Sequence, residues 1–229
     1  MTQVPPANET EASILSRRSI RGFLPDPVAR ETVEHLLDVA GRAPSGTNMQ
    51  PWRVIALAGE ERRRFCDAVA GAYTSGAEHA SEWPYYPSPL LEPYLGRRRE
   101  VGWALYGLLG IARGDRDKAR AHLVNSLHFF GAPVGLVCVI DRALKLGSWL
   151  DYGMFLENIA VAARACGLDT CAMAVFADYP NTIRALLGLP DSDMIVCGMA
   201  IGREDRGAPA NALRTTRVPA GEFTDFRGF

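Results

Sequence analysis

The sequence lacks an excess of charge of either sign. Its 229 residues carry 25 Lys and Arg against 26 Asp and Glu, a formal net charge of -1 at pH 7. A protein that binds nucleic acid usually shows a strong basic excess. The balance therefore argues against a nucleic-acid partner, and it leaves the basic residues to act locally.

Long hydrophobic runs are also missing, although 48% of the residues are hydrophobic. No window approaches the roughly 18 uncharged apolar residues that a membrane-spanning helix needs, so we expect no membrane partner. Repeats and linkers are not visible either, and the length is sufficient for a substantial core. We predict a single domain over residues 1–229, with flexible residues 1–8 at its start.

Metal-binding and disulfide spacings are absent as well. The five cysteines include no Cys-x-x-Cys pair, and the four histidines show no His-x-x-x-His spacing. An odd number of thiols, mostly in apolar runs, is typical of buried reduced cysteines in a cytoplasmic protein. We therefore assign no metal and predict a cytoplasmic location.

Residues 16–24 superficially resemble a twin-arginine export signal. Such a signal needs an apolar stretch after the arginines, whereas Pro25-Asp26-Pro27 and a charged helix follow here. This reading would move the protein to another compartment, and the sequence downstream argues against it.

Apolar periodicity predicts alternating helices and strands. The expected helices cover residues 9–16, 27–41 with Asp26 as N-cap and Pro27 at the first position, 60–77, 97–112, 115–129, 149–166 and 179–187. The expected strands cover residues 53–58, 133–140, 168–176 and 194–201. Residues 81–95 hold four prolines, three tyrosines and a tryptophan, and they predict a lid-like loop. This alternation by itself favours a parallel α/β sheet.

Two polar stretches near the amino terminus suggest one ligand. Residues Arg17, Arg18, Ser19 and Arg21 place three guanidiniums and a hydroxyl within an extended length of about 17 Å, which suits a phosphate. The turn with Pro44, Ser45, Gly46, Asn48 and Gln50 offers side-chain amides that suit the edge of a heterocycle. Solvated surface charges and an ordinary structural turn are the alternatives.

Three segments carry a resemblance to a known family. Arg-Arg-Ser-Ile-Arg (17–21), Ala-Pro-Ser-Gly-x-Asn-x-Gln-Pro-Trp (43–52) and the tail 211–217 occur in this order in FMN-dependent nitroreductases. The chain resembles this family from about Ile14 to the C-terminus. It is most similar to the bacterial nitrobenzoate and nitroaromatic reductase branch, which residues 80–94, 147–153 and 223–229 also follow.

The resemblance implies an α+β nitroreductase-like fold, with a mixed, mostly antiparallel sheet flanked by helices. It further implies an intertwined homodimer with active sites at the subunit interface. The tail, residues 203–229, is then expected to reach over the partner subunit.

The resemblance also implies an FMN site. Arg17, Arg18, Ser19 and Arg21 correspond to phosphate and ribityl contacts, and Arg217 to a basic residue that closes over the phosphate. Arg214 and Arg203 are weaker candidates for that role. The family places Pro44, Ser45 and Gly46 against the flavin, with Asn48 close to the ring and Gln50 beside it.

One departure from the family pattern falls in the loop that faces flavin N5. Ala172 and Met173 stand where the family usually has Pro-Gln, and the backbone of Ala174 and Val175 is expected near N5. Because backbone amides are the donors there, the changed side chains need not remove the contact. Met173 would pack either on the ring or in the core. No catalytic side chain is expected, because FMN carries the chemistry.

Aromatic side chains offer a place for the acceptor. Tyr85 and Tyr86 in the proline-rich loop, and Trp149 at the start of a long helix, suit a planar aromatic substrate. A hydrophobic seal against a second subunit is the alternative for the tyrosines, and core packing is the alternative for Trp149.

The resemblance thus implies an oxidoreductase that takes a hydride from NADH or NADPH and reduces a nitroaromatic or similar electron-poor acceptor by a ping-pong mechanism. Other reactions on the same scaffold stay open, including quinone or enone reduction, reductive dehalogenation, flavin destruction and biosynthetic desaturation. A flavin-binding protein without turnover and an unrelated phosphate-binding module are the alternatives from other classes.

Overall fold

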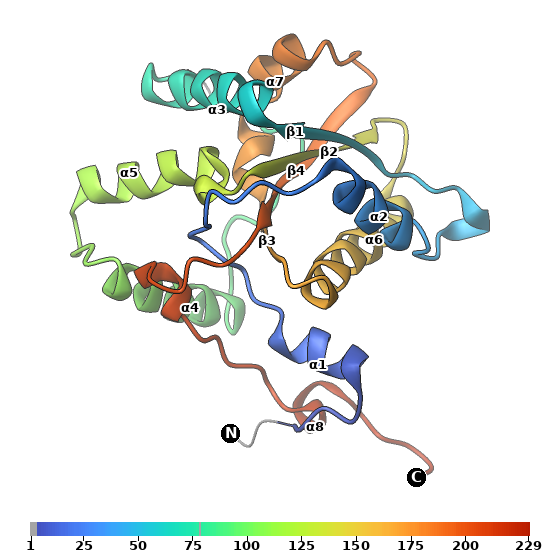
Figure 1. Cartoon of the computed structure of the whole chain (residues 1–229). Coiled ribbons are helices and arrows are strands. Elements are labelled where there is room, and N and C mark those ends of the chain that lie inside the picture. The colour runs from blue at the N-terminus through green and yellow to red at the C-terminus, as the bar shows by residue number, and fades with distance from the viewer. Residues whose placement is uncertain (1–3, 78) are drawn as a thin grey trace.

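The computed structural model describes residues 4–77 and 79–229 and has an α+β architecture (Figure 1). Within these residues one sheet has the strand order β1-β2-β4-β3. The strands are β1 Arg53–Ala58, β2 Val134–Asp141, β3 Asp169–Met173 and β4 Asp193–Gly202. All the strand pairs of this sheet are antiparallel, and an isolated parallel bridge joins Ser19 to Thr170. The mostly antiparallel sheet implied by the resemblance is confirmed, and the parallel sheet favoured by pattern alone is wrong.

Helices pack on both faces of this sheet (Figure 1). The helices of the described residues are α1 Glu9–Ser16, α2 Arg30–Ala40, α3 Gly59–Thr74, α4 Tyr94–Leu108, α5 Arg116–Leu127, α6 Leu146–Ala165, α7 Pro180–Leu187 and α8 Ala220–Phe223, of which α2, α3, α5, α6 and α7 pack on the sheet. Short 3-10 turns are η1 Gly46–Asn48, η2 Phe129–Gly131, η3 Ala174–Asp178 and η4 Pro209–Ala212. None of these helices, within the described residues, combines the length and apolarity needed to cross a bilayer.

Alternation along β2 divides the core into two layers. Val137 and Val139 point to one face of the sheet, where they join residues of α3, α5 and α7. Leu136 and Ile140 point to the opposite face, toward α2 and α6. Because both faces are covered, β2 and β4 are buried almost throughout, and their sequences are continuously apolar.

The predicted start of the second helix is wrong. The structure begins α2 at Arg30, with Ala29 as N-cap and no side-chain cap, rather than with Asp26 as N-cap and Pro27 at the first position. The chain before it is held extended, because the Leu24 N–H donates to the Arg203 carbonyl over 2.9 Å. Val28 then packs against the core, and Ala29 is still extended, with φ -63° and ψ 146°, so the helix begins at Arg30.

The third predicted strand is too long at its C-terminal end. β3 ends at Met173, and residues 174–178 form η3. The turn drives Phe176 into the core, where its ring stacks on Phe129 at 4.6 Å and lies 5.8 Å from Phe65. Gly198 of β4 leaves room for the Phe176 ring, because a Cβ there would lie 2.3 Å from it. Packing therefore decides where the strand stops.

Candidate functional site

The segment after α1 presents its polar side chains outward from the edge of the sheet. The Ile20 N–H donates to the Thr170 carbonyl over 3.0 Å, which holds the segment beside β3. Ile20 is fully buried. Since side chains alternate along an extended chain, Ser19 and Arg21 face away from the core. Both line a cavity of about 1110 Å³.

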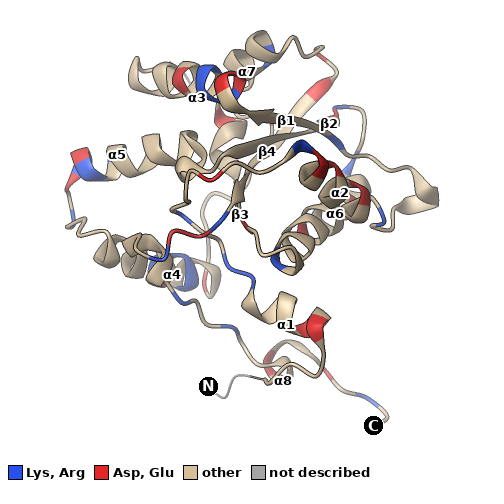
Figure 2. Cartoon of the chain, viewed as in Figure 1, with Lys and Arg blue, Asp and Glu red and all other residues tan. Residues whose placement is uncertain are grey.

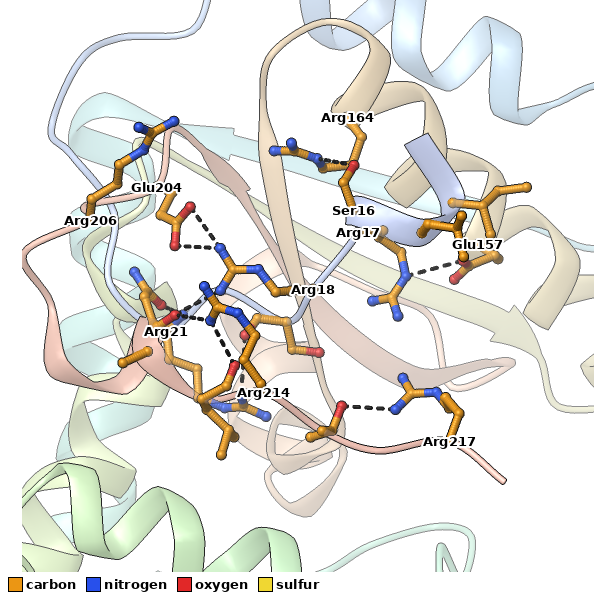
Figure 3. Close-up of a pocket in the computed structure, with 17 residues that line it drawn as sticks. Ser16, Arg17, Arg18, Arg21, Glu157, Arg164, Glu204, Arg206, Arg214 and Arg217 are labelled. Carbon is orange, nitrogen blue, oxygen red and sulfur yellow. Dashed lines mark hydrogen bonds and ion pairs between the residues drawn. The ribbon is translucent and has the colours of Figure 1, made fainter. Parts of the chain in front are cut away.

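The cavity lies between the N-terminal segment, α6 and the C-terminal segment (Figure 3). Seven of its lining residues are arginines, and two are glutamates. The volume is at the upper end of what one small-molecule ligand occupies. Figure 2 shows the same concentration of basic residues along the two terminal segments near α1 and α4. Positive charge gathered in a concave site attracts an anion, even though the whole chain is nearly neutral.

Three of these arginines are paired with carboxylates. Arg18 makes a two-pronged ion pair with Glu204, at 2.7 and 2.9 Å. The Arg17 Nε lies 3.2 Å from a Glu157 oxygen, and the Arg164 Nη1 lies 2.5 Å from an oxygen of buried Asp169. These pairs fix the side chains but neutralise part of their charge.

The other four have no carboxylate within ion-pair distance in the described part of the chain. They are Arg21, Arg206, Arg214 and Arg217. Arg214 donates to the carbonyls of Asn211 and Leu213, and Arg217 donates to the Thr215 hydroxyl over 2.8 Å. These groups leave the guanidinium charges uncompensated. A dianionic phosphate suits such a site better than a neutral ligand does.

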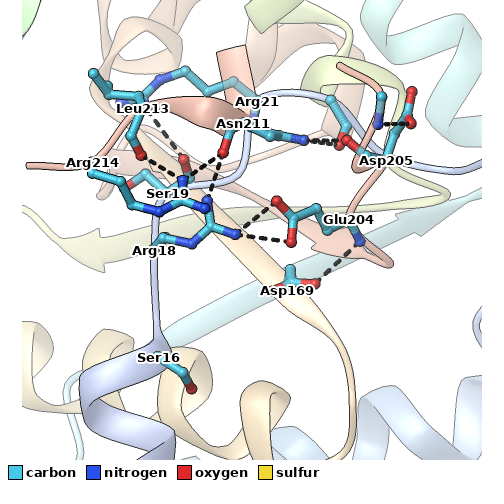
Figure 4. A network of polar contacts seen from close by, with 12 residues as sticks. Ser16, Arg18, Ser19, Arg21, Asp169, Glu204, Asp205, Asn211, Leu213 and Arg214 are labelled. Atoms are coloured by element: carbon cyan, nitrogen blue, oxygen red, sulfur yellow. Dashed lines mark hydrogen bonds and ion pairs between the residues drawn. The ribbon is translucent and has the colours of Figure 1, made fainter. Parts of the chain in front are cut away.

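Asn211 joins the two terminal segments from a buried position (Figure 4). Its Oδ1 accepts from the Arg21 N–H over 2.7 Å, and its Nδ2 donates to the carbonyls of Gly22 and Asp205, both over 2.8 Å. Its own carbonyl accepts from Arg18. The amide thereby aligns arginines that are nearly 200 residues apart in the sequence.

A second link runs through Asp169, which is buried at the start of β3. One of its oxygens pairs with Arg164, and the other accepts from the Glu204 N–H over 3.1 Å. Glu204 in turn holds Arg18. Sequence reasoning missed this network and the roles of Glu157, Arg164 and Arg206. For Glu157 and Arg164, a signal in the sequence was their charge within the mostly apolar helix α6.

A narrower pocket of about 130 Å³ adjoins the cavity and shares Arg17, Ser19 and Glu157 with it. Thr170, Cys171 and Ala172 of β3 line one side, and residues of α6 line the other. Burial raises the pKa of the Cys171 thiol to about 11, against the opposing effect of the nearby arginines Arg21 and Arg17. The thiol is therefore protonated and unreactive at neutral pH.

Met173 lies in the core and not against this pocket. Its side chain is only 6% exposed and packs in the same layer as Phe176. The sequence left two roles open for Met173, packing on the ring or packing in the core. In this chain the side chain packs in the core. Ala174 and Val175 follow at the start of η3, half buried, and are not among the residues that line either pocket.

The predicted amide turn lies apart from the arginines. Figure 1 places η1 beyond α2, on a different side of the molecule from α1, and no residue of the range 44–50 lines the cavity. The turn is held to α6 by the Gly46 N–H, which donates to Asp151 over 3.0 Å. Thr47, Asn48 and Gln50 have positive φ, and Pro44, Asn48 and Gln50 are exposed. Within one chain the two predicted halves of the site do not meet.

The aromatic candidates gather around Trp83. Its ring lies 4.9 Å from that of Trp149 and 5.5 Å from that of Tyr85, and Tyr85 contacts Tyr86 at 4.6 Å. The Arg98 guanidinium lies over the Tyr86 ring at 4.5 Å. Tyr85 and Tyr86 are 60% and 49% exposed. They form a separate aromatic surface, outside the arginine-lined cavity.

Among the described residues, the α+β fold carries an arginine-rich cavity between the two terminal segments. Comparison with known proteins assigns a family to this fold. The Nitroreductase family model matches residues 14–203, and the chain belongs to this family.

Curated relatives and solved structures agree with this assignment. A 4-nitrobenzoate reductase of Pseudomonas putida is 40% identical over 223 residues, which cover 97% of this chain and 97% of that protein. A nitrobenzene nitroreductase of Ectopseudomonas oleovorans is 40% identical over 214 residues, covering 93% and 94%. The crystal structure of the FMN and NADPH-dependent nitroreductase NfnB from Sphigopyxis sp. strain HMH matches with a TM-score of 0.92 and 38% identity, covering 96% and 99%.

Proposed function

We propose that this protein is an FMN-dependent oxidoreductase that takes a hydride from NAD(P)H and reduces a nitroaromatic or similarly electron-poor acceptor in a ping-pong cycle. The observation that carries the proposal is the cavity in which four arginines have no carboxylate partner among the described residues. The family and the nitroarene substrates named for its relatives support the choice of reaction.

The residues present fit FMN. We assign its phosphate and ribityl chain to Arg17, Arg18, Ser19, Arg21 and Arg217, all of which line the cavity. Arg18 keeps its Nε–H for this purpose, since its terminal nitrogens donate to Glu204 and Asn211. Bound FMN supplies the electron-transfer chemistry, and the chain supplies charge, orientation and exclusion of water.

We assign the flavin ring to the side of the cavity where the adjoining pocket lies. Ala172 is exposed toward it, whereas Met173 is buried in the core. Our assignment of residues 172–175 to the ring therefore rests on their backbone groups, with Ala174 and Val175 as the N–H donors near N5. A backbone donor tolerates the Ala-Met sequence, because the N–H is the same for both residues.

We further propose a homodimer in which the partner subunit completes each site. Pro44, Ser45, Gly46, Asn48 and Gln50 are assigned to the flavin, yet their turn lies outside the cavity of its own chain. Exposed apolar side chains lie where a partner is expected. On α1 they are Ile14 and Leu15, and in the tail Phe223, Phe226 and Phe229. In this proposal the tail, residues 203–229, crosses the partner, and residues 1–229 form one FMN-binding domain.

Tyr85, Tyr86 and Trp149 are assigned to the aromatic acceptor, because their rings form an accessible surface around Trp83. A cytoplasmic location is part of the proposal. It is supported by the reduced state of all five cysteines, of which Cys66, Cys138, Cys171 and Cys197 are buried.

The test is an absorbance spectrum of the purified protein followed by anaerobic mixing. We expect a flavin band near about 450 nm that bleaches with NADPH or NADH and returns with a nitroarene, together with parallel lines in initial-rate plots. A colourless protein that does not take up FMN would contradict the proposal. A yellow protein that neither nicotinamide reduces would instead be a flavin-binding protein without turnover.

A matched pair of variants tests the arginine assignment. Arg217→Ala removes a cavity arginine, and Arg203→Ala removes an exposed arginine that does not line the cavity. Loss of a hydrogen bond to a charged group costs about 1.5–3 kcal/mol, so Arg217→Ala should weaken FMN binding by roughly 10- to 100-fold. Flavin fluorescence titration measures both affinities. Equal affinities in the two variants would reject the phosphate role of Arg217.

A further inference from the structure

The aromatic loop, which we define as residues 81–93, is attached firmly at its start. Just before it, the Ala80 N–H donates to the Asp178 carbonyl over 3.0 Å. The Trp83 indole N–H donates to the Ile195 carbonyl of β4 over 2.8 Å. Between these two bonds lies Glu82, whose side chain is only 16% exposed. A carboxylate held this far from solvent needs a partner.

Glu82 has two partners from distant parts of the fold. Its Oε1 accepts from Arg142, just after β2, and from Arg184 of α7 over 2.9 Å. Arg184 also donates to the Asp193 carbonyl at the start of β4 over 3.1 Å. Arg142 donates to the Asp191 carbonyl over 3.1 Å. One carboxylate thus joins the aromatic loop to β2, α7 and β4.

The burial of this cluster separates it from an ordinary surface salt bridge. The Arg184 side chain is 14% exposed, so its attraction to Glu82 is screened little by water. Within the described residues, Glu82 Oε2 and Arg184 Nε are buried without a hydrogen-bond partner. An incompletely satisfied buried cluster is a poor source of stability. The Glu82 cluster is better explained by the position in which it holds the aromatic loop.

Beyond Trp83 the attachment weakens. Tyr85, Tyr86 and Leu91 are 60%, 49% and 64% exposed. The tyrosine rings are held mainly by contact with one another, with Trp83 and with Arg98. Trp83 also contacts Trp149 of α6. The position of this aromatic surface therefore follows from where residues 82 and 83 are fixed.

We propose that Glu82 is a positioning residue which, through Arg142 and Arg184, sets the placement of Trp83, Tyr85 and Tyr86 and thereby selects planar aromatic acceptors. The inference rests on the proposed function, because it concerns the acceptor of that same reaction. Glu82 acts through the rings beside it and does not itself touch the acceptor.

The test compares three variants of the flavin-loaded protein. Glu82→Gln keeps the shape and removes the charge. Arg142→Gln removes the more exposed partner, 44% exposed, and leaves the Glu82–Arg184 pair in place. Glu60→Gln is the control, because it makes the same chemical change in an exposed ion pair with Arg63 on α3. Flavin content and the unfolding midpoint are measured first for each.

Two acceptors then distinguish a positioning role of Glu82 from a loss of activity that affects every acceptor. Nitrobenzene is planar and uses the rings, whereas ferricyanide is a compact inorganic oxidant that needs no stacking surface. We expect Glu82→Gln to lower the ratio of kcat/KM for nitrobenzene to that for ferricyanide about tenfold, since small misplacements of binding groups have effects of this size or larger. Arg142→Gln should lower it less, and Glu60→Gln should leave it unchanged. Quenching of tryptophan fluorescence gives the nitrobenzene dissociation constant independently, and it should rise in the same order.

The outcomes are distinct. An unchanged ratio and unchanged dissociation constant in both cluster variants would overturn the inference while leaving the proposed function intact. Equal losses with both acceptors would also overturn it, because they indicate a merely structural role. A wild-type protein that reduces ferricyanide but not nitrobenzene would refute the proposed acceptor, and this inference with it.

Discussion

The arginines of the cavity differ in whether a carboxylate already offsets their charge, and this difference determines how well each can bind an anion. Arg18 is held by Glu204 in a two-pronged pair, whereas Arg217 contacts only neutral oxygens among the described residues. An ion pair orients a guanidinium but offsets its charge, so the two residues contribute differently to a phosphate site. Arg18 mainly connects the terminal segments, and Arg217 offers a charge that no carboxylate offsets.

The buried thiols predict a loss of stability in alkali. Burial raises the pKa of Cys66 and of Cys171 from 9.0 to about 11. Because the unfolded chain releases these protons first, the stabilisation is complete below pH 9 and is lost as the pH rises toward 11. At pH 10.5 each thiol should cost about 2 kcal/mol in the free energy of unfolding. Urea unfolding at pH 8.5 and 10.5 measures it.

Two variants make the alkaline prediction specific. Cys171→Ala should reduce the difference between the two pH values by about 2 kcal/mol, because one of the buried protons is gone. Cys166→Ala should not reduce it, since Cys166 is exposed. The same difference in Cys171→Ala as in the wild type would show that the thiol does not titrate as its burial requires.

Residue types predicted the ligand better than they predicted the contacts. Arg17, Ser19, Arg21 and Arg217 were expected at a phosphate, and the structure brings them to one cavity. The pairing of Arg18 with Glu204 spans 186 residues, and no local pattern contains it. Asn211 was visible in a tail segment that resembles the family, but its bonds to Arg21, Gly22 and Asp205 depend on the fold.

At the scale of elements, period and length identified most helices and strands. α1 and β1 have the predicted bounds, and Asp115 caps α5 by accepting from the Lys118 N–H over 3.1 Å. Strand direction was not predictable in this way. A strand covered on both faces is apolar throughout, whether its neighbours are parallel or antiparallel. The sequences of β2 and β4 therefore do not indicate the direction of the neighbouring strands.

The end of β3 gives a prediction at this scale. A Cβ at Gly198 would lie 2.3 Å from the Phe176 ring, which Phe65 and Phe129 prevent from moving. Gly198→Ala should therefore destabilise the protein by about 1–3 kcal/mol. Gly71→Ala is the control, because on α3 nothing lies within 4 Å of its Cβ, and a gain of about 0.5–1 kcal/mol is expected there. Urea unfolding at neutral pH measures both, and similar values for the two variants would contradict this account of β3.

At the scale of the whole molecule, the sequence order of the site differs from its arrangement in space. The arginines of the N-terminal segment and the turn at 44–50 are separated by about 25 residues, yet α2 and α6 place them on different sides of one chain (Figure 1). Arg217, which lies 200 residues after Arg17 in the sequence, lines the same cavity. The sequence analysis assigned the N-terminal arginines, the turn and the tail to one site, because the sequence does not show how they are arranged in space. The homodimer that we propose reconciles the grouping with the structure.

Mixing two impaired variants tests that arrangement. In a dimer whose sites each combine Arg217 of one subunit with Asn48 of the other, Arg217→Ala and Asn48→Ala each impair both sites. A mixed dimer then holds one intact site and one site with both substitutions. Random exchange of equal amounts makes half of the dimers mixed, so about a quarter of wild-type activity and flavin binding should return.

The control for this exchange is each variant denatured and refolded alone, which should stay impaired. Sedimentation at the same concentration establishes whether dimers form. Dimers that exchange subunits without regaining activity or flavin would place Asn48 and Arg217 in the same chain's site. In the described chain the turn at 44–50 lies outside its own cavity. A failure to regain activity would therefore require α2 and α6 to rearrange when FMN binds. Recovery of activity would instead show that Asn48 and Arg217 of one site come from different subunits.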